Sequence, residues 1–235
     1  MISPLEFQNQ IKSIVDDSLN SQKELGFKDD GSAVTNLDIE VERRIIEMIE
    51  KNFNGITIIS EENPQSHQSS YDLSDRNFAI IDPIDGTENF YFFNEIYGCV
   101  VSVVYGEFEY HGIYVPSRGD FFSTLSKKSK LKTLPKTKLL STSCLSNVKR
   151  LDLSDRSLYR ILGSSSYMFY LLLQGKAFSY TYCSNAKIWD CYTGLTLLYF
   201  HANFYEIELL DKNGVEFNPY SNFFDHFTSF HAQIR

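Results

Sequence analysis

Residues 82–90, with the sequence Asp-Pro-Ile-Asp-Gly-Thr-Glu-Asn-Phe, constrain the fold of this chain more than any other segment. They follow a short apolar run, residues 78–81, whose length is typical of a buried strand. Pro83 has a fixed φ and favours an extended conformation in the residue before it, so the chain turns sharply where the strand ends. Gly86 allows the backbone to approach a ligand closely, and Thr87 lies where a helix is expected to begin. The pattern therefore predicts a strand, a turn and a helix.

Two carboxylates three positions apart on such a turn indicate a metal and phosphate site. Mg²⁺ prefers oxygen ligands, and the free N–H groups at a helix N-terminus favour a phosphate. An Asp-x-x-Asp pair by itself more often caps a turn. Here the strand, proline, glycine and threonine all favour the ligand-binding interpretation. We therefore expect Asp82 and Asp85 to bind a cation, and the N–H groups of Gly86 and Thr87 to hold a phosphate.

Four blocks of sequence together resemble the inositol monophosphatase family, the lithium-sensitive, magnesium-dependent phosphatases of sugars and nucleotides. Residues 82–90 resemble its signature, and residues 28–38 resemble its Lys…Val-Thr…Asp block. Residues 59–62 resemble its Glu-Glu block, and residues 189–194 its Trp-Asp block, so the blocks follow the family's order. The resemblance implies an α+β fold, a layered α-β-α-β-α sandwich of the inositol monophosphatase and sugar phosphatase type.

The resemblance also implies a set of metal ligands for two to three Mg²⁺ ions. Glu61, Asp82 and the carbonyl of Ile84 would bind one ion. Asp82, Asp85 and Asp190 would bind a second, and a weaker third ion would lie near Glu61. Asp190 belongs to the second half of the chain, so the site would close only where the two halves meet.

A metal-activated water is expected to attack the phosphate ester, because no cysteine or serine has an obvious activating base beside it. By resemblance, Thr87, hydrogen-bonded to Asp38, would orient that water together with Glu61. Asp38 is also expected to complete a helix capping box, and the two roles are compatible. For the substrate, Gly163 and Ser164 resemble the family's substrate-facing glycine turn.

Other polar residues are expected to matter less. Lys28 is a single lysine in a polar loop and is predicted to face solvent, and Glu62 receives only a supporting role. The histidines are scattered without metal-ligand spacing and are predicted to be incidental. Trp189 is expected to be a packed anchor beside Asp190.

The resemblance favours a small sugar or polyol phosphate, such as inositol 1-phosphate, as the substrate. Cys183 departs from the family pattern, because inositol monophosphatases have an acidic acceptor of inositol hydroxyls seven positions before the residue that matches Asp190. 3′-Phosphoadenosine 5′-phosphate and fructose 1,6-bisphosphate therefore remain alternative substrates. Residues 191–193 also depart from the family and leave open another class, a partner-binding protein with vestigial activity.

Charge and composition narrow the classes of partner. A net charge of −8 argues against nucleic acid and anionic membrane surfaces as partners. No apolar run is long enough for a membrane span, and no signal peptide is apparent. The cysteines lack C-x-x-C spacing and are predicted to be packed, reduced thiols of a cytoplasmic protein.

The spacing of apolar residues predicts the remaining elements. It predicts helices at 5–25, 35–53, 163–174 and 189–200 and strands at 56–59, 98–105, 108–115, 120–125, 139–141, 159–162 and 177–182. Residues 28–34 are predicted to be a loop, 63–77 a mobile surface loop, and 203–217 a closing hairpin around Asn213-Gly214. We expect a compact unit with two halves, residues 1–138 carrying most of the metal ligands and residues 139–235 contributing Asp190.

Members of this family are commonly homodimers, and the resemblance implies the same here. Residues 90–93 are four consecutive aromatics, which cannot all face one core in a helix or a strand. At least one is expected to be covered by another surface. In the alternative arrangement Phe90 and Phe93 pack inward, while Tyr91 and Phe92 lie beneath the 63–77 loop.

Overall fold

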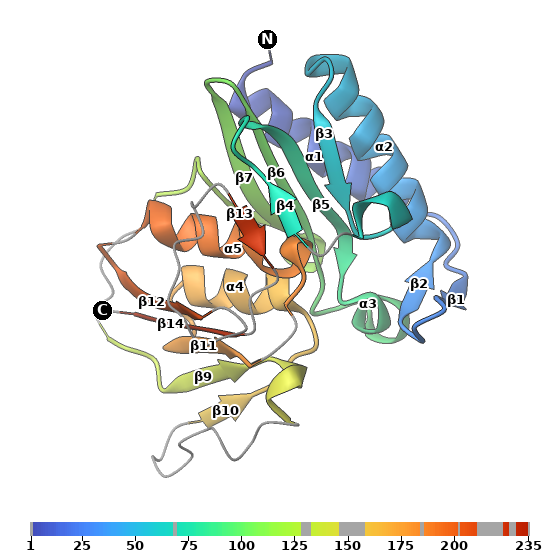
Figure 1. The fold of residues 1–235 in the computed structure, drawn as a ribbon. Helices are drawn as coiled ribbons and strands as arrows, with labels where there is room; N and C mark the ends of the chain where they lie inside the picture. The colour runs from blue at the N-terminus through green and yellow to red at the C-terminus, as the bar shows by residue number, and fades with distance from the viewer. Residues whose placement is uncertain are drawn as a thin grey trace.

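The computed structural model describes residues 2–67, 70–127, 133–145, 158–183, 186–201, 203–210, 223–225 and 229–234. Its helices and sheets are stacked in layers (Figure 1). The predicted layered α+β architecture is therefore confirmed. In the described part of the chain the layers follow the order helices, sheet, helices, sheet. The outermost helical layer of the predicted order is not among the described elements.

The first sheet has five strands in the order β3-β5-β6-β7-β8. They are β3 (Thr57–Ser60), β5 (Asn77–Asp85), β6 (Gly98–Tyr105), β7 (Phe108–Val115) and β8 (Asp120–Ser123). β3 and β5 are parallel, and the other neighbours are antiparallel. Along β5 the side chains alternate between two cores, because successive strand residues point to opposite faces. Ala79 and Ile81 pack toward α1 (Pro4–Ser18) and α2 (Asn36–Asn52), whereas Phe78 and Ile80 pack on the opposite side.

The second sheet has the order β10-β9-β11-β14-β12. Its strands are β9 (Thr137–Leu140), β10 (Leu158–Arg160), β11 (Ser179–Tyr182), β12 (Tyr205–Leu210) and β14 (Ser229–Ile234). β9, β10 and β11 are parallel, and β14 is antiparallel to both of its neighbours. The predicted division of the chain into halves at residue 138 stays a prediction.

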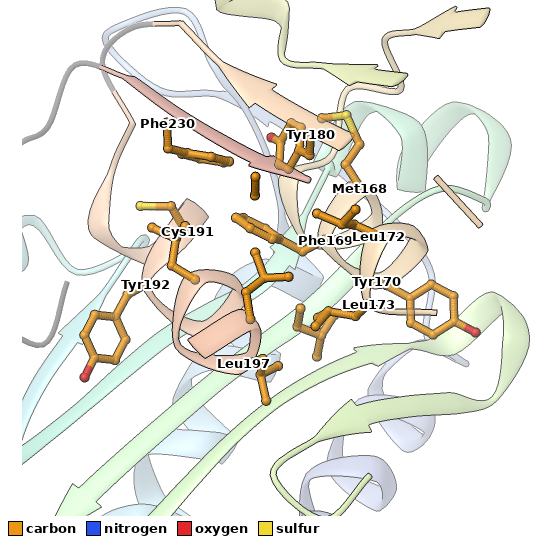
Figure 2. Close-up of a cluster of buried hydrophobic side chains, with 14 of the residues drawn as sticks. Met168, Phe169, Tyr170, Leu172, Leu173, Tyr180, Cys191, Tyr192, Leu197 and Phe230 are labelled. Carbon is orange, nitrogen blue, oxygen red and sulfur yellow. The ribbon is translucent and has the colours of Figure 1, made fainter. Parts of the chain in front are cut away.

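Helices α4 (Ser165–Leu173) and α5 (Ile188–Phe200) lie between the two sheets and share one core with both (Figures 1 and 2). Phe169 of α4 stacks on Phe230 with ring centroids 5.3 Å apart and meets Tyr180 edge-on at 5.0 Å. A Cβ on Gly194 of α5 would lie 2.3 Å from the Phe169 ring. This glycine therefore allows α4 and α5 to pack in contact.

Several predicted elements differ from the structure in their extent. The first helix ends at Ser18, and Leu25–Phe27 (β1) instead pairs with Ala33–Thr35 (β2). The predicted 63–77 loop contains a short helix, Pro64–Ser66, and a strand, Ser70–Asp72 (β4), which pairs with Phe223–Asp225 (β13). In the predicted closing hairpin, β12 pairs with β14, and residues 215–217 lie outside the described residues.

The prediction that all cysteines are reduced thiols is wrong for Cys144 and Cys183, which form a disulfide with Cα atoms 5.0 Å apart. No local pattern indicated this pairing, because the two residues are separated by 39 positions. The parallel pairing of β9 with β11 brings them together. Cys99 and Cys191 are free and buried, as predicted. None of the described helices has both the length and the apolar content that a membrane span requires.

Candidate active site

The carboxyl end of β5 carries the first two acidic residues of the candidate site. Asp82 pairs with Val100 of β6, and Asp85 pairs with Gly98, so β5 has one extra residue in this interval. In a regular strand, residues three apart point to opposite faces. The extra residue cancels that alternation, which is how a bulge redirects a side chain. Both aspartates therefore reach the same site.

Among the residues that the structure describes, Asp82 is the carboxylate whose buried oxygens lack a hydrogen-bond partner. Its side chain is 1% exposed, and among the described residues neither of its oxygens has a hydrogen-bond partner. Burial raises the pKa of Asp82 well above its usual value, and the nearby Glu61, Asp85 and Asp190 raise it further. An unpaired buried carboxylate is costly unless a cation compensates it. The environment of Asp82 therefore fits a metal ligand.

Asp190 joins this pair from the start of α5. Ligand oxygens of Asp82, Asp85 and Asp190 lie within 4.8 Å of one another. Asp190 accepts hydrogen bonds from the Lys187 N–H at 3.2 Å and the Tyr182 hydroxyl at 3.4 Å. Burial, followed by the charges of Asp85 and Glu61, raises its pKa to about 8. Three carboxylates at this separation, two of them buried and that of Asp190 half-buried, repel one another and match the oxygen donors that Mg²⁺ binds.

Asp85 also fixes the turn before α4. Its Oδ2 accepts hydrogen bonds from Ser164 Oγ at 2.6 Å and from the Ser166 N–H at 2.5 Å. Ser164 is the N-cap of α4, so one carboxylate connects β5 to the beginning of that helix. Sequence reasoning predicted Gly163 and Ser164 here but missed Ser166. The helix start at residues 163–166 was the available signal, since the first N–H groups of a helix need acceptors.

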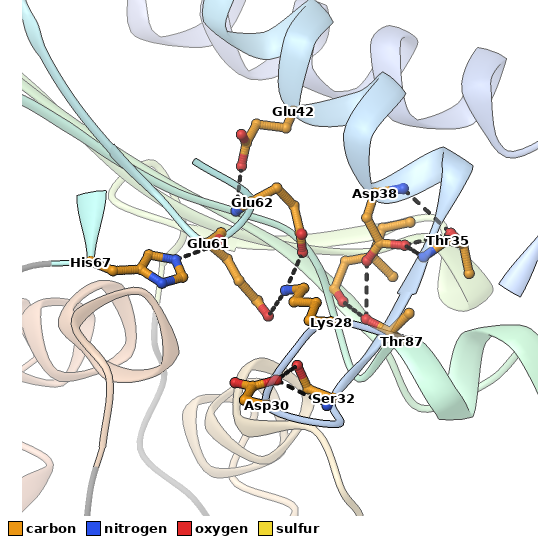
Figure 3. A network of polar contacts seen from close by, with 11 residues as sticks. Lys28, Asp30, Ser32, Thr35, Asp38, Glu42, Glu61, Glu62, His67 and Thr87 are labelled. Carbon is orange, nitrogen blue, oxygen red and sulfur yellow. Dashed lines mark hydrogen bonds and ion pairs between the residues drawn. The ribbon is translucent and has the colours of Figure 1, made fainter. Parts of the chain in front are cut away.

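Glu61 follows β3, and its side chain forms an ion pair with Lys28 rather than joining the three aspartates. The Lys28 Nζ lies 2.9 Å from Glu61 Oε1 and 2.7 Å from Glu62 Oε1 (Figure 3). The prediction that Lys28 faces solvent is therefore wrong. Burial, followed by the charge of Glu61, raises the pKa of Glu62 to about 7.

His67 was predicted to be incidental, but it lies beside the site. Its Nε2 is 2.8 Å from the Glu61 carbonyl oxygen (Figure 3). Its ring centroid is 5.0 Å from that of Trp189. The histidine thus links the end of β3 to the beginning of α5. No spacing in the sequence indicated this contact, because it joins segments far apart in the chain.

Thr87 and Asp38 are in direct contact at the opposite side of the turn. The Thr87 hydroxyl lies 3.0 Å from Asp38 Oδ1 and 3.1 Å from the Ile84 carbonyl oxygen (Figure 3). The second Asp38 oxygen accepts a hydrogen bond from the Thr35 N–H at 2.8 Å and completes the predicted capping box of α2. Burial raises the pKa of Asp38, although hydrogen bonds from Thr35 and Thr87 oppose the shift.

A pocket of about 170 Å³ opens beside the aspartates. It lies at the carboxyl ends of the parallel strands β9 and β11, where ligands commonly bind in sheets of this kind. Its lining combines two carboxylates with hydroxyl side chains, a glycine and one apolar residue: Asp85, Ser141, Thr142, Gly163, Ser164, Ser165, Met168, Tyr182 and Asp190. Tyr182, Ser141 and Thr142 were not predicted as site residues, because nothing in their local sequence marks them.

Comparison with known proteins then decides the family. The sequence model of the inositol monophosphatase family matches residues 5–199. The chain belongs to the inositol monophosphatase family. A comparison with curated protein sequences found no match. Together with the buried aspartates, membership supports a metal-dependent phosphatase, a phosphoric monoester hydrolase.

Solved structures show the same fold at low sequence identity. The IMPase of Thermotoga maritima is 18% identical to this chain, with a TM-score of 0.71. The match covers 97% of this chain and 90% of the Thermotoga chain. A staphylococcal IMPase-I complexed with products is 16% identical with a TM-score of 0.72, covering 97% and 88%. An IMPase/NADP phosphatase complexed with Mg²⁺ and phosphate is 18% identical with a TM-score of 0.68, covering 97% and 88%.

Proposed function

We propose that this protein is a Mg²⁺-dependent phosphomonoesterase that hydrolyses a small sugar or polyol phosphate. The proposal rests on the environment of the Asp82 carboxylate. Both of its oxygens are buried without a described hydrogen-bond partner, and they lie in a cluster with Asp85 and Asp190. Each of these residues repels the others in the absence of a cation. A divalent cation turns this destabilising arrangement into a binding site.

We assign two to three Mg²⁺ ions to a ligand set of five groups. These are the carboxylates of Glu61, Asp82, Asp85 and Asp190 and the carbonyl oxygen of Ile84. Glu61 is close enough to raise the pKa of Asp82, although the structure pairs it with Lys28. When bound, such ions supply Lewis-acid chemistry, neutralising phosphate charge and activating a water molecule.

The residues of the turn position the reactants. The Thr87 hydroxyl has a single proton, which it donates to Asp38 Oδ1 at 3.0 Å. Its oxygen then has lone pairs free to accept a hydrogen bond from the attacking water. Asp38 holds Thr87 in this orientation, and Glu61 is proposed to orient the same water. The N–H groups of Gly86 and Thr87, at the start of α3 (Thr87–Phe93), are proposed to hold the phosphate.

The pocket favours a polyol or sugar as the remainder of the substrate. Ser141, Thr142, Ser165 and Tyr182 place hydroxyl groups along its lining. Such groups donate and accept hydrogen bonds and therefore match the hydroxyls of a sugar. Gly163 has a φ of +74°, and the turn that it forms brings Ser164 to the pocket.

The test is phosphate release with Mg²⁺ over inositol 1-phosphate, fructose 1,6-bisphosphate and 3′-phosphoadenosine 5′-phosphate. Asp85→Asn keeps an acceptor for Ser164 and Ser166 but loses the charge, so turnover should fall by about 100-fold or more. Asp29→Asn makes the same charge change at an exposed position and is the matched control. Unchanged turnover in Asp85→Asn would refute the metal-site assignment. Robust activity on the adenosine bisphosphate alone would overturn the substrate class, and turnover of none of the esters would favour a partner-binding role.

We also propose a homodimer. Phe92 and Phe93 are 62% and 72% exposed in the single chain, so the alternative in which Phe93 packs inward and Phe92 is covered is wrong. Exposed aromatic side chains side by side are typical of an interface. Light scattering at micromolar concentration measures the mass directly, and a monomer mass would remove the dimer from the proposal.

A further inference from the structure

The Cys144–Cys183 disulfide lies next to two segments that line the pocket. Cys144 follows Ser141 and Thr142, and Cys183 follows Tyr182; these three neighbours all line the pocket. Both cysteines are buried, and they pack with Leu140 and Tyr159. The bond therefore joins two walls of the same pocket.

Backbone pairing between these walls ends just before the disulfide. β9 and β11 pair as far as Leu140 and Thr181, and the Ser141 N–H then donates to the Thr181 carbonyl at 2.9 Å. Beyond that point, the Cys183 N–H donates to Ser143 Oγ at 3.2 Å, and the disulfide adds a covalent connection. A crosslink where strand pairing stops limits how far the two walls can separate.

Tyr182 connects this wall to the aspartates. Its hydroxyl donates to Asp190 Oδ2 at 3.4 Å, and its backbone immediately precedes Cys183. Movement of the Cys183 segment therefore moves a side chain that borders both the pocket and the acidic cluster. The consequence falls mainly on ligand binding, because Asp82 and Asp85 are held on β5, which belongs to the other sheet.

We propose that the Cys144–Cys183 disulfide is a specificity-determining clamp that holds the pocket walls in position for the non-phosphate part of the substrate. The inference rests on the proposed function and names a further determinant of the same site. In the oxidised protein the walls at Thr142 and Tyr182 are pre-organised, which lowers the entropic cost of binding. Reduction releases the walls and weakens substrate binding.

The redox step is a thiol–disulfide exchange with an external dithiol. A thiolate of the dithiol attacks Cys183 Sγ, because Cys183 is 8% exposed and Cys144 is 0% exposed. The Cys144–Cys183 bond breaks, Cys144 leaves as a thiolate that takes up a proton, and a mixed disulfide forms at Cys183. The second thiol of the dithiol then displaces the Cys183 sulfur. The protein gains two electrons and two protons as two thiols, and the dithiol becomes a disulfide.

The first measurement establishes the bond and its effect on kinetics. Thiol titration of the denatured, oxidised protein should find two of the four cysteines reactive, and all four after treatment with dithiothreitol. Reduction should raise KM for the best phosphate ester roughly fivefold to tenfold, with kcat within about twofold. The double variant Cys144→Ser/Cys183→Ser should match the reduced protein and no longer respond to dithiothreitol.

The second measurement does not depend on activity. Hydrogen exchange should become faster in residues 139–145 and 179–183 after reduction, while β6 stays protected. Four reactive thiols in the oxidised protein, or equal KM and exchange in both redox states, would overturn the clamp and leave the phosphatase proposal intact. Absence of turnover in both states would refute the proposed function, and the exchange measurement would still decide whether the disulfide holds the walls. Because wild-type protein provides both redox states, the test stands even where the double variant fails to fold.

Discussion

Replacing Asp82 with asparagine should abolish activity and yet stabilise the metal-free protein. Asp82 has no described hydrogen-bond partner and lies with Asp85 and Asp190 inside 4.8 Å. In the absence of a cation the folded protein must therefore protonate this cluster or hold repelling charges, and each unit of pKa shift corresponds to about 1.4 kcal/mol. The asparagine keeps the shape of the side chain, removes one charge and offers N–H donors to the two remaining carboxylates.

The expected gain follows from the cost of burying a polar group without a partner. That cost is about 1–3 kcal/mol, so Asp82→Asn should raise the free energy of unfolding by about this amount in the presence of a chelator. For a chain of this length the gain corresponds to a rise in Tm of roughly 2–12 °C. Saturating Mg²⁺ should reverse the order, because a ligand at about 1,000 times its Kd stabilises the wild type by about 4.1 kcal/mol, more than the gain of the variant. The variant should gain little from the metal.

The Tm of the wild type and of Asp82→Asn can be measured at pH 8 by circular dichroism, each with EDTA and with Mg²⁺. Asp29→Asn is the matched control, since Asp29 is exposed and the same change there should alter stability by less than about 0.5 kcal/mol. A variant that is less stable than the wild type in EDTA would refute the reasoning. Equal stabilisation of both proteins by Mg²⁺ would show that the metal binds elsewhere.

Three further predictions test other parts of the site. Thr87→Val should lower kcat by about 10²–10⁴-fold and the free energy of unfolding by about 1–3 kcal/mol, because it removes the hydroxyl that donates to the buried Asp38 carboxylate; a kcat within twofold of wild type in the phosphate-release assay would contradict this. Gly86→Ala should lower the free energy of unfolding by at least about 1–2 kcal/mol in urea, because the glycine has a φ of +94° and the new Cβ would lie 2.9 Å from the Ser164 Cβ. The stability of the metal-free protein should fall as the pH rises from about 4 to about 8. In that range Asp190, with a pKa of about 8, binds more protons in the folded than in the unfolded state. Chelator-treated protein melting at a higher temperature at pH 8 than at pH 5.5 would show the opposite sign.

Local features of the site were predictable from short stretches of sequence. The capping box formed by Thr35 and Asp38 depends on residues three apart, and the structure contains it. The helix start at Thr87 follows in the same way from Gly86 and its neighbours, but the turn predicted at Pro83 is wrong, because β5 continues through Pro83 and ends at Asp85. Such features are predictable because their interactions form within one turn or one strand end.

Apart from contacts that the resemblance implied, such as that of Thr87 with Asp38, features that depend on contacts across the chain were not predictable. The prediction that Lys28 faces solvent failed, because its partners, Glu61 and Glu62, lie on another element. The predicted loop at 63–77 contains β4, which pairs with β13 from near the end of the chain. The pattern of apolar and polar residues within a segment cannot indicate a partner strand that lies more than a hundred residues away.

The sequence by itself determined the helix start that follows Gly86 and, through the resemblance, the acidic residues that belong with it. Only the tertiary structure decided that Asp82, Asp85 and Asp190 lie within 4.8 Å of one another and that both Asp82 oxygens lack a described partner. It also decided that β9 and β11 lie side by side, which joins Cys144 to Cys183 beside the pocket. The physical reason is that a turn is stabilised by neighbours in the chain, whereas burial and long-range proximity exist only once the helices and sheets have packed.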